Sequence, residues 1–214
     1  GSSIEWRKLI MAPLTLRSSI LELINREAER HAPEQPWHII AKLNAIVDEE
    51  VIRALYSASQ KGVKIDLLVR GICCLRPGLE GISDNIRVIS VVGRFLEHSR
   101  ILYFHNGGQQ EIYLSSADWM PRNLNRRVEL MFPVEDADNR ARLKEILESY
   151  LNDTVKAREL GSDGMYRRKE KHETGINAQE QFIAQIRQSD PATEGAPRPK
   201  RSNKQHTTLV VKKN

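Results

Sequence analysis

Apolar residues in the first 160 positions fall either in short continuous runs or in longer stretches with a helical period. Continuous runs rich in β-branched and aromatic residues are typical of strands, whereas apolar residues three to four apart are typical of amphipathic helices. This pattern predicts strands over 6–13, 37–44, 63–71, 86–92, 100–105, 111–117 and 127–134. It predicts helices over 15–30, about 49–61 and about 138–156.

The order of these elements indicates the fold class. Strands that alternate with helices favour parallel pairing, and the nearly continuous apolar run at 63–71 indicates a strand buried on both faces. An Asn-Gly-Gly turn at 106–108 predicts a β-hairpin, which is antiparallel. We therefore expect an α/β domain with a mixed β-sheet flanked by helices over residues 4–160.

The chain changes character near Gly161. Residues 161–214 contain 11 basic and 6 acidic side chains, which account for the whole net charge of +5. Within a C-terminal extension of 161–188, apolar spacing predicts a short helix over 176–188. Residues 189–214 are rich in proline, polar and basic residues and cannot bury much apolar surface, so we expect a disordered basic tail.

Composition narrows the classes of function. No apolar run approaches the roughly 20 residues of a membrane-spanning helix, so we expect no span. Cys73 and Cys74 are adjacent, a spacing that rarely forms a disulfide and makes a poor zinc site, which favours reduced thiols in the cytoplasm. Because the basic excess is confined to the tail, the pI of about 9.3 gives no reason to expect a specific nucleic-acid partner.

Polar side chains gather near the predicted ends of several strands, where α/β sheets commonly bind ligands. They are cations, hydroxyls, amides, one carboxylate and one imidazole, a set that suits an anion with many oxygens, such as a phosphate chain. No cluster typical of a metal site accompanies them. The candidates are Lys42, Asn44, Arg70, His98, Arg100, Ser115, Ser116, Asp118, Asn123 and Arg127.

Each candidate alone also has a purely structural interpretation. His98 is equally compatible with a core histidine whose ring is satisfied by Glu97 or by a backbone carbonyl. Arg70 is compatible with an ordinary surface arginine, and the basic run at 122–127 with a solvated loop. The case for a phosphate site therefore depends on the order of these residues along one sheet.

That order resembles a known family. The segments "LVRGICCL", "RFLEHSRI", "SSADWM" and "RNLNRRVE" follow one another here as in the C-terminal catalytic domain of polyphosphate kinase, the ATP:polyphosphate phosphotransferase. The resemblance covers about residues 4–160 and continues weakly through "DGMYRR" and "INAQEQF". It implies a phospholipase D-like fold, whose H-x-K motif appears here as His98-x-Arg100.

The resemblance also implies a reaction. In the family, the terminal phosphate of ATP passes reversibly to polyphosphate through a phosphohistidine, with Mg²⁺ neutralising the phosphates. Arg70 and His98 match the family's ATP-contacting positions, and His98 would also be catalytic. The histidine that becomes phosphorylated lies in a preceding domain, so this chain is expected to supply half of a site and to be inactive alone. The expected partners are ATP or ADP, polyphosphate, and the missing N-terminal, head and first C-terminal domains.

The complete enzyme is expected to be a homo-oligomer in the cytoplasm, with membrane association as an open alternative. A second interpretation of the same motif is a phosphodiesterase or phosphatidyltransferase of the phospholipase D superfamily, although Arg100 in place of lysine counts against it. A third is a non-catalytic module that binds polyanions through the tail. The main hypothesis requires that Arg70 and His98 converge at one edge of the sheet.

Overall fold

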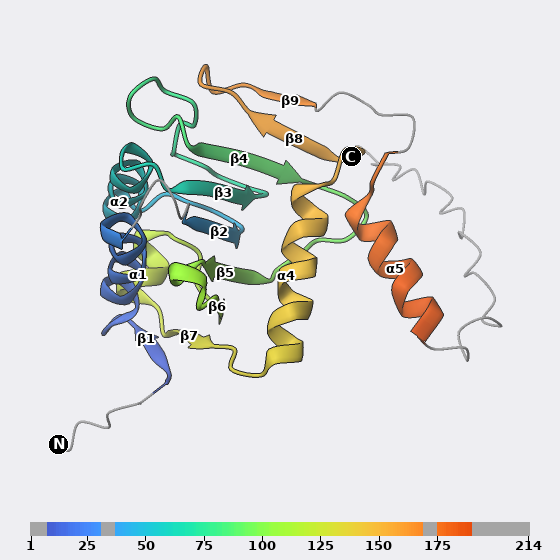
Figure 1. Cartoon of the computed structure of the whole chain (residues 1–214), viewed down its shortest axis with the longest axis horizontal. Coiled ribbons are helices and arrows are strands. Elements are labelled where there is room, and N and C mark those ends of the chain that lie inside the picture. The colour runs from blue at the N-terminus through green and yellow to red at the C-terminus, as the bar shows by residue number, and fades with distance from the viewer. Residues whose placement is uncertain (1–7, 31–36, 169–174, 190–214) are drawn as a thin grey trace, which may run out of the picture.

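The computed structural model describes residues 8–30, 37–168 and 175–189. Strands and helices alternate in the first half, and a meander of strands follows (Figure 1). The elements are β1 (Ile10–Ala12), α1 (Leu16–Arg30), β2 (His38–Leu43), α2 (Glu49–Gln60), β3 (Lys64–Val69), β4 (Ile86–Val91), β5 (Arg100–Phe104), η1 (Asn106–Gly108), β6 (Glu111–Ser115), α3 (Pro121–Arg126), β7 (Glu129–Pro133), α4 (Ala137–Leu151), β8 (Ala157–Leu160), β9 (Tyr166–Arg168) and α5 (Ala178–Ser189).

The strands form one mixed sheet in the order β1-β7-β6-β5-β2-β3-β4-β8-β9. Strands β2, β3 and β4 are parallel, and every other neighbouring pair is antiparallel. The predicted α/β fold with a mixed sheet is therefore confirmed. The carboxyl ends of β2 and β3, the amino end of β5 and the carboxyl end of β6 consequently lie along the same edge of the sheet.

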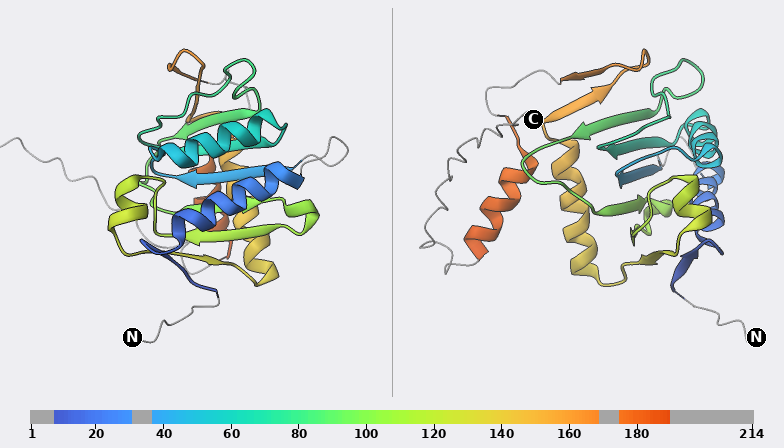
Figure 2. Two further views of the ribbon diagram at one scale, coloured as in Figure 1. Left: turned by 90° about the vertical axis from the view of Figure 1, so that its left-hand side faces the viewer. Right: turned by 180° about the vertical axis from the view of Figure 1, so that it is seen from behind.

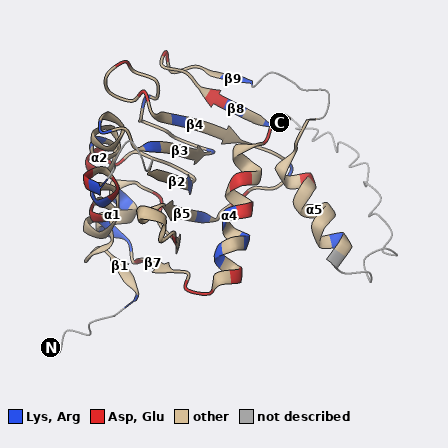
Figure 3. Ribbon diagram, viewed as in Figure 1, with Lys and Arg blue, Asp and Glu red and all other residues tan. Residues whose placement is uncertain are grey.

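Two apolar layers cover the two faces of the sheet. Helices α1 and α2 pack on one face around residues such as Ile20, Leu55 and Leu67, and α4 packs on the other around Ile40 and Leu147 (Figure 2). Because β2 and β3 are covered on both sides, each has a run of consecutive apolar residues, Ile39–Ala41 and Leu67–Val69, rather than a strict alternation. Lys, Arg, Asp and Glu mix along α2 and α4, so neither helix carries charge of one sign (Figure 3).

Two aspartates determine where long helices begin. Asp48 accepts a hydrogen bond from the Val51 amide at the start of α2, and Asp136 accepts one from the Asn139 amide at the start of α4. Each carboxylate satisfies an amide that the helix itself leaves without a partner. Asp48 is fully buried and also pairs with Arg17 of α1, which ties the two helices together.

The prediction was wrong in several local details. Helix α4 ends at Leu151 rather than near residue 156, because the buried Asp153 carboxylate accepts the backbone amides of Lys156 and Ala157 and turns the chain into β8. Strands β8 and β9, which the sequence pattern did not predict, extend the sheet beyond β4.

Two further segments differ from the expectation. The basic run expected as a loop forms the short helix α3, with Pro121 in its first turn, so β7 begins at Glu129 rather than at residue 127. The turn of the β5–β6 hairpin is a single 3₁₀ turn with Asn106 and Gly107 at positive φ. Residues 6–7 of the predicted first strand and residues 190–214 of the predicted tail lie outside the described residues.

None of the helices in the described ranges combines the length and apolarity needed to cross a bilayer. The two cysteines are free thiols: Cys73 is half-buried and Cys74 is exposed. Burial raises the pKa of the Cys73 thiol to about 11, so it is protonated near neutral pH.

Glu27 on α1 is a buried acid at the far end of the β5–β6 hairpin. Its side chain is 0% exposed, and its Oε1 accepts the Asn106 backbone amide at 2.9 Å. Among the described residues, its Oε2 has no hydrogen-bond partner. Burial raises its pKa from 4.5 to about 7, against the opposing effects of the Asn106 amide and Arg26.

This raised pKa predicts a pH-dependent stability. The folded state holds the Glu27 proton more tightly than the unfolded chain, so its stabilising contribution is complete below pH 4.5 and is lost as the pH rises to about 7. At about 1.4 kcal/mol per pKa unit, the loss is about 3 kcal/mol. Glu27→Gln should remove this slope in urea unfolding between pH 4.5 and 7, whereas Glu29→Gln, at an exposed position of the same helix, should keep it. Equal slopes in both variants would contradict the assignment.

Candidate functional site

The predicted site residues lie along one edge of the sheet because four strand ends meet there. Asn44 and Arg70 directly follow the parallel strands β2 and β3, His98 lies two residues before the start of β5, and Asp118 follows β6. The antiparallel direction of β5 brings its amino end beside the carboxyl end of β2. The topology therefore gathers residues that are up to 74 positions apart in the chain.

A continuous series of hydrogen bonds joins Arg70 to His98. Arg70 Nε donates to Asn44 Oδ1 at 2.6 Å, and Asn44 Nδ2 donates to Asp118 Oδ2 at 3.2 Å. Arg100 donates to both oxygens of Asp118, from Nη2 at 2.8 Å and from Nε at 3.3 Å. Arg100 Nη1 then reaches His98 Nδ1 at 3.0 Å. We call Arg70, Asn44, Asp118, Arg100 and His98 the edge network.

Asp118 is the centre of the edge network. It is 7% exposed, and its Oδ1 also accepts the backbone amides of Asn44 at 2.6 Å and of Ala45 at 3.3 Å. Burial alone would raise its pKa, but the Arg100 guanidinium and the Asn44 donors outweigh burial and lower it. The carboxylate is therefore ionised and fully engaged, and it fixes the Arg100 guanidinium in one plane.

Trp119, which is 1% exposed, directly follows Asp118 and is bonded through its backbone to the segment after β2. Its carbonyl accepts the amides of Val47 and Asp48, and its amide donates to the Ala45 carbonyl. Residues 44–48 and 118–119 are thus tied together by backbone hydrogen bonds next to the site.

The contact between Arg100 and His98 assigns a tautomer to the imidazole. A guanidinium has only donors, so His98 Nδ1 must accept the hydrogen bond, and the neutral ring carries its proton on Nε2. Arg100 Nη1 also donates to the His98 carbonyl at 2.9 Å, which fixes the backbone of the same residue. His98 is exposed, so its Nε2–H is accessible from outside the protein. This arrangement is not that of a core histidine.

Lys42 lies beside the edge network but is already paired. Its side chain is 8% exposed, its Nζ lies 3.0 Å from Glu97 Oε2 and 3.1 Å from Ser99 Oγ, and it sits 5.0 Å from the centre of the Tyr150 ring. Burial raises the pKa of Glu97, but hydrogen bonds from Tyr150 and Gln179 and the charge of Lys42 lower it overall. Lys42, Arg70, Glu97 and Tyr150 line a cavity of about 20 Å³, room for about one water molecule.

A second set of candidates lies around Glu129 at the start of β7. This carboxylate accepts Ser116 Oγ at 2.5 Å and Asn123 Nδ2 at 2.8 Å, and Arg127 Nη1 approaches it at 3.9 Å. Ser115 Oγ instead donates to the Leu130 carbonyl. The hydroxyls and the amide therefore hold the connection between β6 and β7, which contains α3. The Arg127 side chain, by contrast, is 52% exposed.

Sequence reasoning missed Glu129, Tyr150 and Gln179. Glu129 lies within a predicted strand and Tyr150 within a predicted helix, and the pattern assigns neither a functional role. Only the tertiary packing of α4 and α5 against the site edge gives the last two a polar role. No periodic or motif signal distinguishes them.

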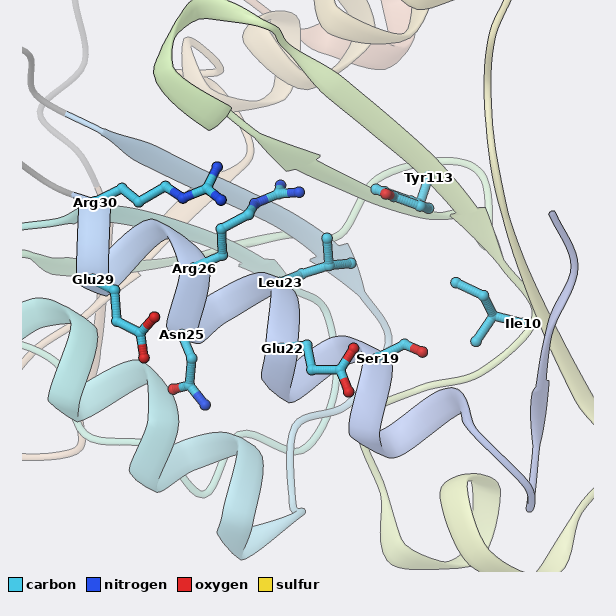
Figure 4. Close-up of a pocket in the computed structure, with 9 residues that line it drawn as sticks. All are labelled: Ile10, Ser19, Glu22, Leu23, Asn25, Arg26, Glu29, Arg30 and Tyr113. Atoms are coloured by element: carbon cyan, nitrogen blue, oxygen red, sulfur yellow. The ribbon is translucent and has the colours of Figure 1, made fainter. Parts of the chain in front are cut away.

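A larger groove lies elsewhere on the molecule. It has a volume of about 620 Å³ and runs between α1 and the sheet, with Arg26, Arg30 and Tyr113 along it (Figure 4). None of the predicted site residues lines it. The candidate site is an open edge that carries charged and polar groups rather than an enclosed pocket.

Comparisons with known proteins identify the family of the chain. A family model described as "Polyphosphate kinase C-terminal domain 2" matches residues 9–179. Polyphosphate kinase of Pseudomonas aeruginosa is 58% identical over 168 residues, which are 78% of this chain and 24% of the relative. That of Rhodopirellula baltica is 52% identical over 193 residues, which are 89% of this chain and 23% of the relative. The chain thus spans about a quarter of the length of these relatives.

Solved structures show the same likeness. The crystal structure of polyphosphate kinase from Porphyromonas gingivalis matches with a TM-score of 0.84 and 39% identity, covering 90% of this chain and 30% of that one. Nuc from Salmonella typhimurium, a phospholipase D family member, matches with a TM-score of 0.54 and 13% identity, covering 72% of this chain and 97% of that one. The fold is therefore phospholipase D-like. Within that class, the chain belongs to the polyphosphate kinase family, as its C-terminal domain 2.

The edge network predicts an asymmetric response to the loss of two acidic residues. Asp118→Ala would leave the Arg100 guanidinium buried without its partner and should lower the free energy of unfolding by about 3–5 kcal/mol. Asp163→Ala removes an acid that pairs with Arg167 at the surface, and it should change stability little. Urea unfolding followed by circular dichroism measures both. Similar effects of the two substitutions would show that the network does not support the fold.

Proposed function

We propose that this domain contributes one half of a site that transfers the terminal phosphate of ATP reversibly to polyphosphate. The edge network is the observation that carries the proposal, because it holds a guanidinium and an imidazole at the two ends of one rigid hydrogen-bonded unit. Membership of the polyphosphate kinase family supports the reaction class. The relatives' remaining three quarters would supply the other half of the site.

Arg70 binds a phosphate group of ATP in this proposal. Its Nε is used by Asn44, which fixes the orientation of the guanidinium. Its two terminal amino groups have no hydrogen-bond partner among the described residues, and the residue is half-buried. A planar pair of donors that is oriented from behind suits bidentate contact with phosphate oxygens.

His98 acts through Nε2. In the tautomer that Arg100 imposes, this atom carries a proton, so it donates a hydrogen bond to a phosphate oxygen and stabilises the negative charge that the phosphate oxygens carry during transfer. The same tautomer has no lone pair on Nε2, which makes His98 a poor nucleophile in this state. This argument supports a phosphohistidine on a preceding domain, with His98 as a hydrogen-bond donor to the phosphate that is transferred.

The other candidates have secondary roles. The positions of Arg70 and His98 are fixed by Asn44, Asp118 and Arg100. The Lys42 ammonium group is buried beside them and paired with Glu97. Arg127 is exposed and only loosely paired, so it is suited to contact a polyphosphate chain. The connection between β6 and β7, which carries Arg127, is held by Ser115, Ser116 and Asn123.

Mg²⁺ enters this proposal as part of the substrate. The carboxylates at the site edge do not fit a metal site, because Asp118 is engaged by Arg100 and Asn44, Glu97 by Lys42 and Gln179, and Glu129 by Ser116 and Asn123. In the described parts of the chain, no group of three or more His, Cys, Asp or Glu residues could hold a metal ion. We therefore place Mg²⁺ on the phosphates of ATP.

The phosphodiesterase alternative finds no support in the site. Its motif has a lysine two residues after the histidine, and here that position is Arg100, whose guanidinium is bound by Asp118 and His98. The polyanion-binding alternative depends on residues 189–214, which, apart from Ser189, lie outside the described residues. Oligomerisation and subcellular location remain proposals for the complete enzyme.

Calorimetric titration with ATP–Mg²⁺ and with polyphosphate tests the binding half of the proposal. Arg70→Ala and His98→Ala should each weaken binding by about tenfold or more, because each removes a charged or directed donor to phosphate. Arg53→Ala, which removes an exposed arginine on α2, should leave the affinity unchanged. Wild-type affinity in both site variants would reject the site.

Activity requires the missing domains. We expect the isolated chain to turn over little ATP, and a chimera in which it replaces the C-terminal quarter of the Pseudomonas aeruginosa enzyme to make polyphosphate. His98→Ala in that chimera should lower kcat by about 10²–10³-fold, the usual effect of losing one preorganised donor to a developing negative charge. Full activity of the His98→Ala chimera would contradict the catalytic role.

A further inference from the structure

The segment that carries His98 has little apolar packing of its own. Residues 92–99 connect β4 to β5, and their apolar side chains point outward: Val92 is 66% exposed, Phe95 50% and Leu96 82%. A connection of this kind has few buried contacts to define one conformation. Arg100 and Lys42 hold the end of the segment next to β5, through His98, Glu97 and Ser99, so the position of the preceding residues depends on another element.

Helix α5 supplies that element through Gln179. This side chain is 5% exposed, its Oε1 accepts the Phe95 amide at 3.0 Å, and its Nε2 donates to the Phe95 carbonyl at 3.1 Å. The side-chain amide thus bonds both polar groups of one residue, as a neighbouring strand would. Nε2 also donates to Glu97 Oε1 at 2.6 Å, one residue before His98.

Gly93 makes this close approach possible. A Cβ atom added to Gly93 would lie 2.3 Å from Gln179 Oε1, far inside van der Waals contact. The glycine has no positive φ, so its role here is the space that it leaves rather than an unusual backbone conformation. The loop and the glutamine side chain therefore fit together as a specific pair.

Helix α5 is itself anchored to the core of the domain. The buried Asp153 carboxylate accepts the Ala178 amide at 2.9 Å, and Thr154 and Ile176 exchange backbone and hydroxyl hydrogen bonds. The Phe182 ring packs 5.4 Å from that of Tyr150. Figure 1 shows α5 beside α4 at the side of the sheet away from α1 and α2. These contacts fix the start of α5, which carries Gln179, against the core of the domain.

We propose that Gln179 is a positioning residue that holds the 92–99 segment so that His98 presents Nε2 at the site edge. The positioning of the 92–99 segment by Gln179 follows from the contacts of α5. Its effect on phosphate binding rests on the proposed function. It makes the extension beyond the sheet part of the site, acting through a side chain that does not contact the substrate. No residue of α5 was among the candidates from sequence.

The first test replaces one amide by a carboxylate. Gln179→Glu keeps the size of the side chain but cannot donate to the Phe95 carbonyl, and it places a second negative charge against Glu97. In the full 214-residue chain, we expect faster hydrogen exchange at the Phe95 amide and altered ring nitrogen shifts of His98 by NMR. Affinity for tripolyphosphate should fall about five- to tenfold. Gln181→Glu adds the same charge at an exposed position of the same helix and should change none of these.

A second variant approaches the same contact from the other side. Gly93→Ala should displace the flexible end of Gln179 without altering α5 or any charge, and it should reproduce the NMR changes of Gln179→Glu. The proposal is overturned if α5 stays folded while Phe95 exchange and the His98 shifts match the wild type in both variants. Hydrogen exchange and the His98 shifts need no ligand, so they test the contact between Gln179 and the 92–99 segment by themselves. Failure of the wild type to bind tripolyphosphate would instead count against the proposed function.

Discussion

The bond between the Asp118 carboxylate and the Arg100 guanidinium is the interaction on which the site depends. Both side chains are about nine-tenths buried, so neither charge would be tolerated there without the other. Asp118 also accepts the amides of Asn44 and Ala45, which fixes the end of β2, while Arg100 fixes the tautomer of His98. A single ion pair therefore couples three strand ends to the orientation of one exposed imidazole.

The sheet makes this ion pair possible by its direction of pairing. The parallel strands β2 and β3 bring Asn44 and Arg70 to one edge, and the antiparallel strand β5 brings Arg100 to the same edge from the opposite direction. Helices on both faces exclude water from the strands but leave their ends open. The result is an edge lined by charged and polar groups rather than an enclosed pocket, which suits the proposed half-site.

The extension after α4 changes how the domain is understood. Strands β8 and β9 widen the sheet, and α5 returns to the site edge, where Gln179 contacts the segment that carries His98. The elements that follow α4 therefore also reach the candidate site edge, through hydrogen bonds from Gln179 to Phe95 and Glu97.

The sequence by itself determined the mixed α/β fold, because the continuous apolar run of β3 and the hairpin turn at 106–108 have few alternative solutions. It also marked Arg70 and His98, since ordered polar residues at strand ends resemble a known family. Only the tertiary structure decided which candidates face outward and which are internal. Ser116 and Asn123 bind Glu129, Lys42 binds Glu97, and Gln179 supports the His98 segment. The contacts that Glu97 makes with Lys42 and Gln179 join residues distant in sequence, and no local period or propensity encodes a contact of that kind.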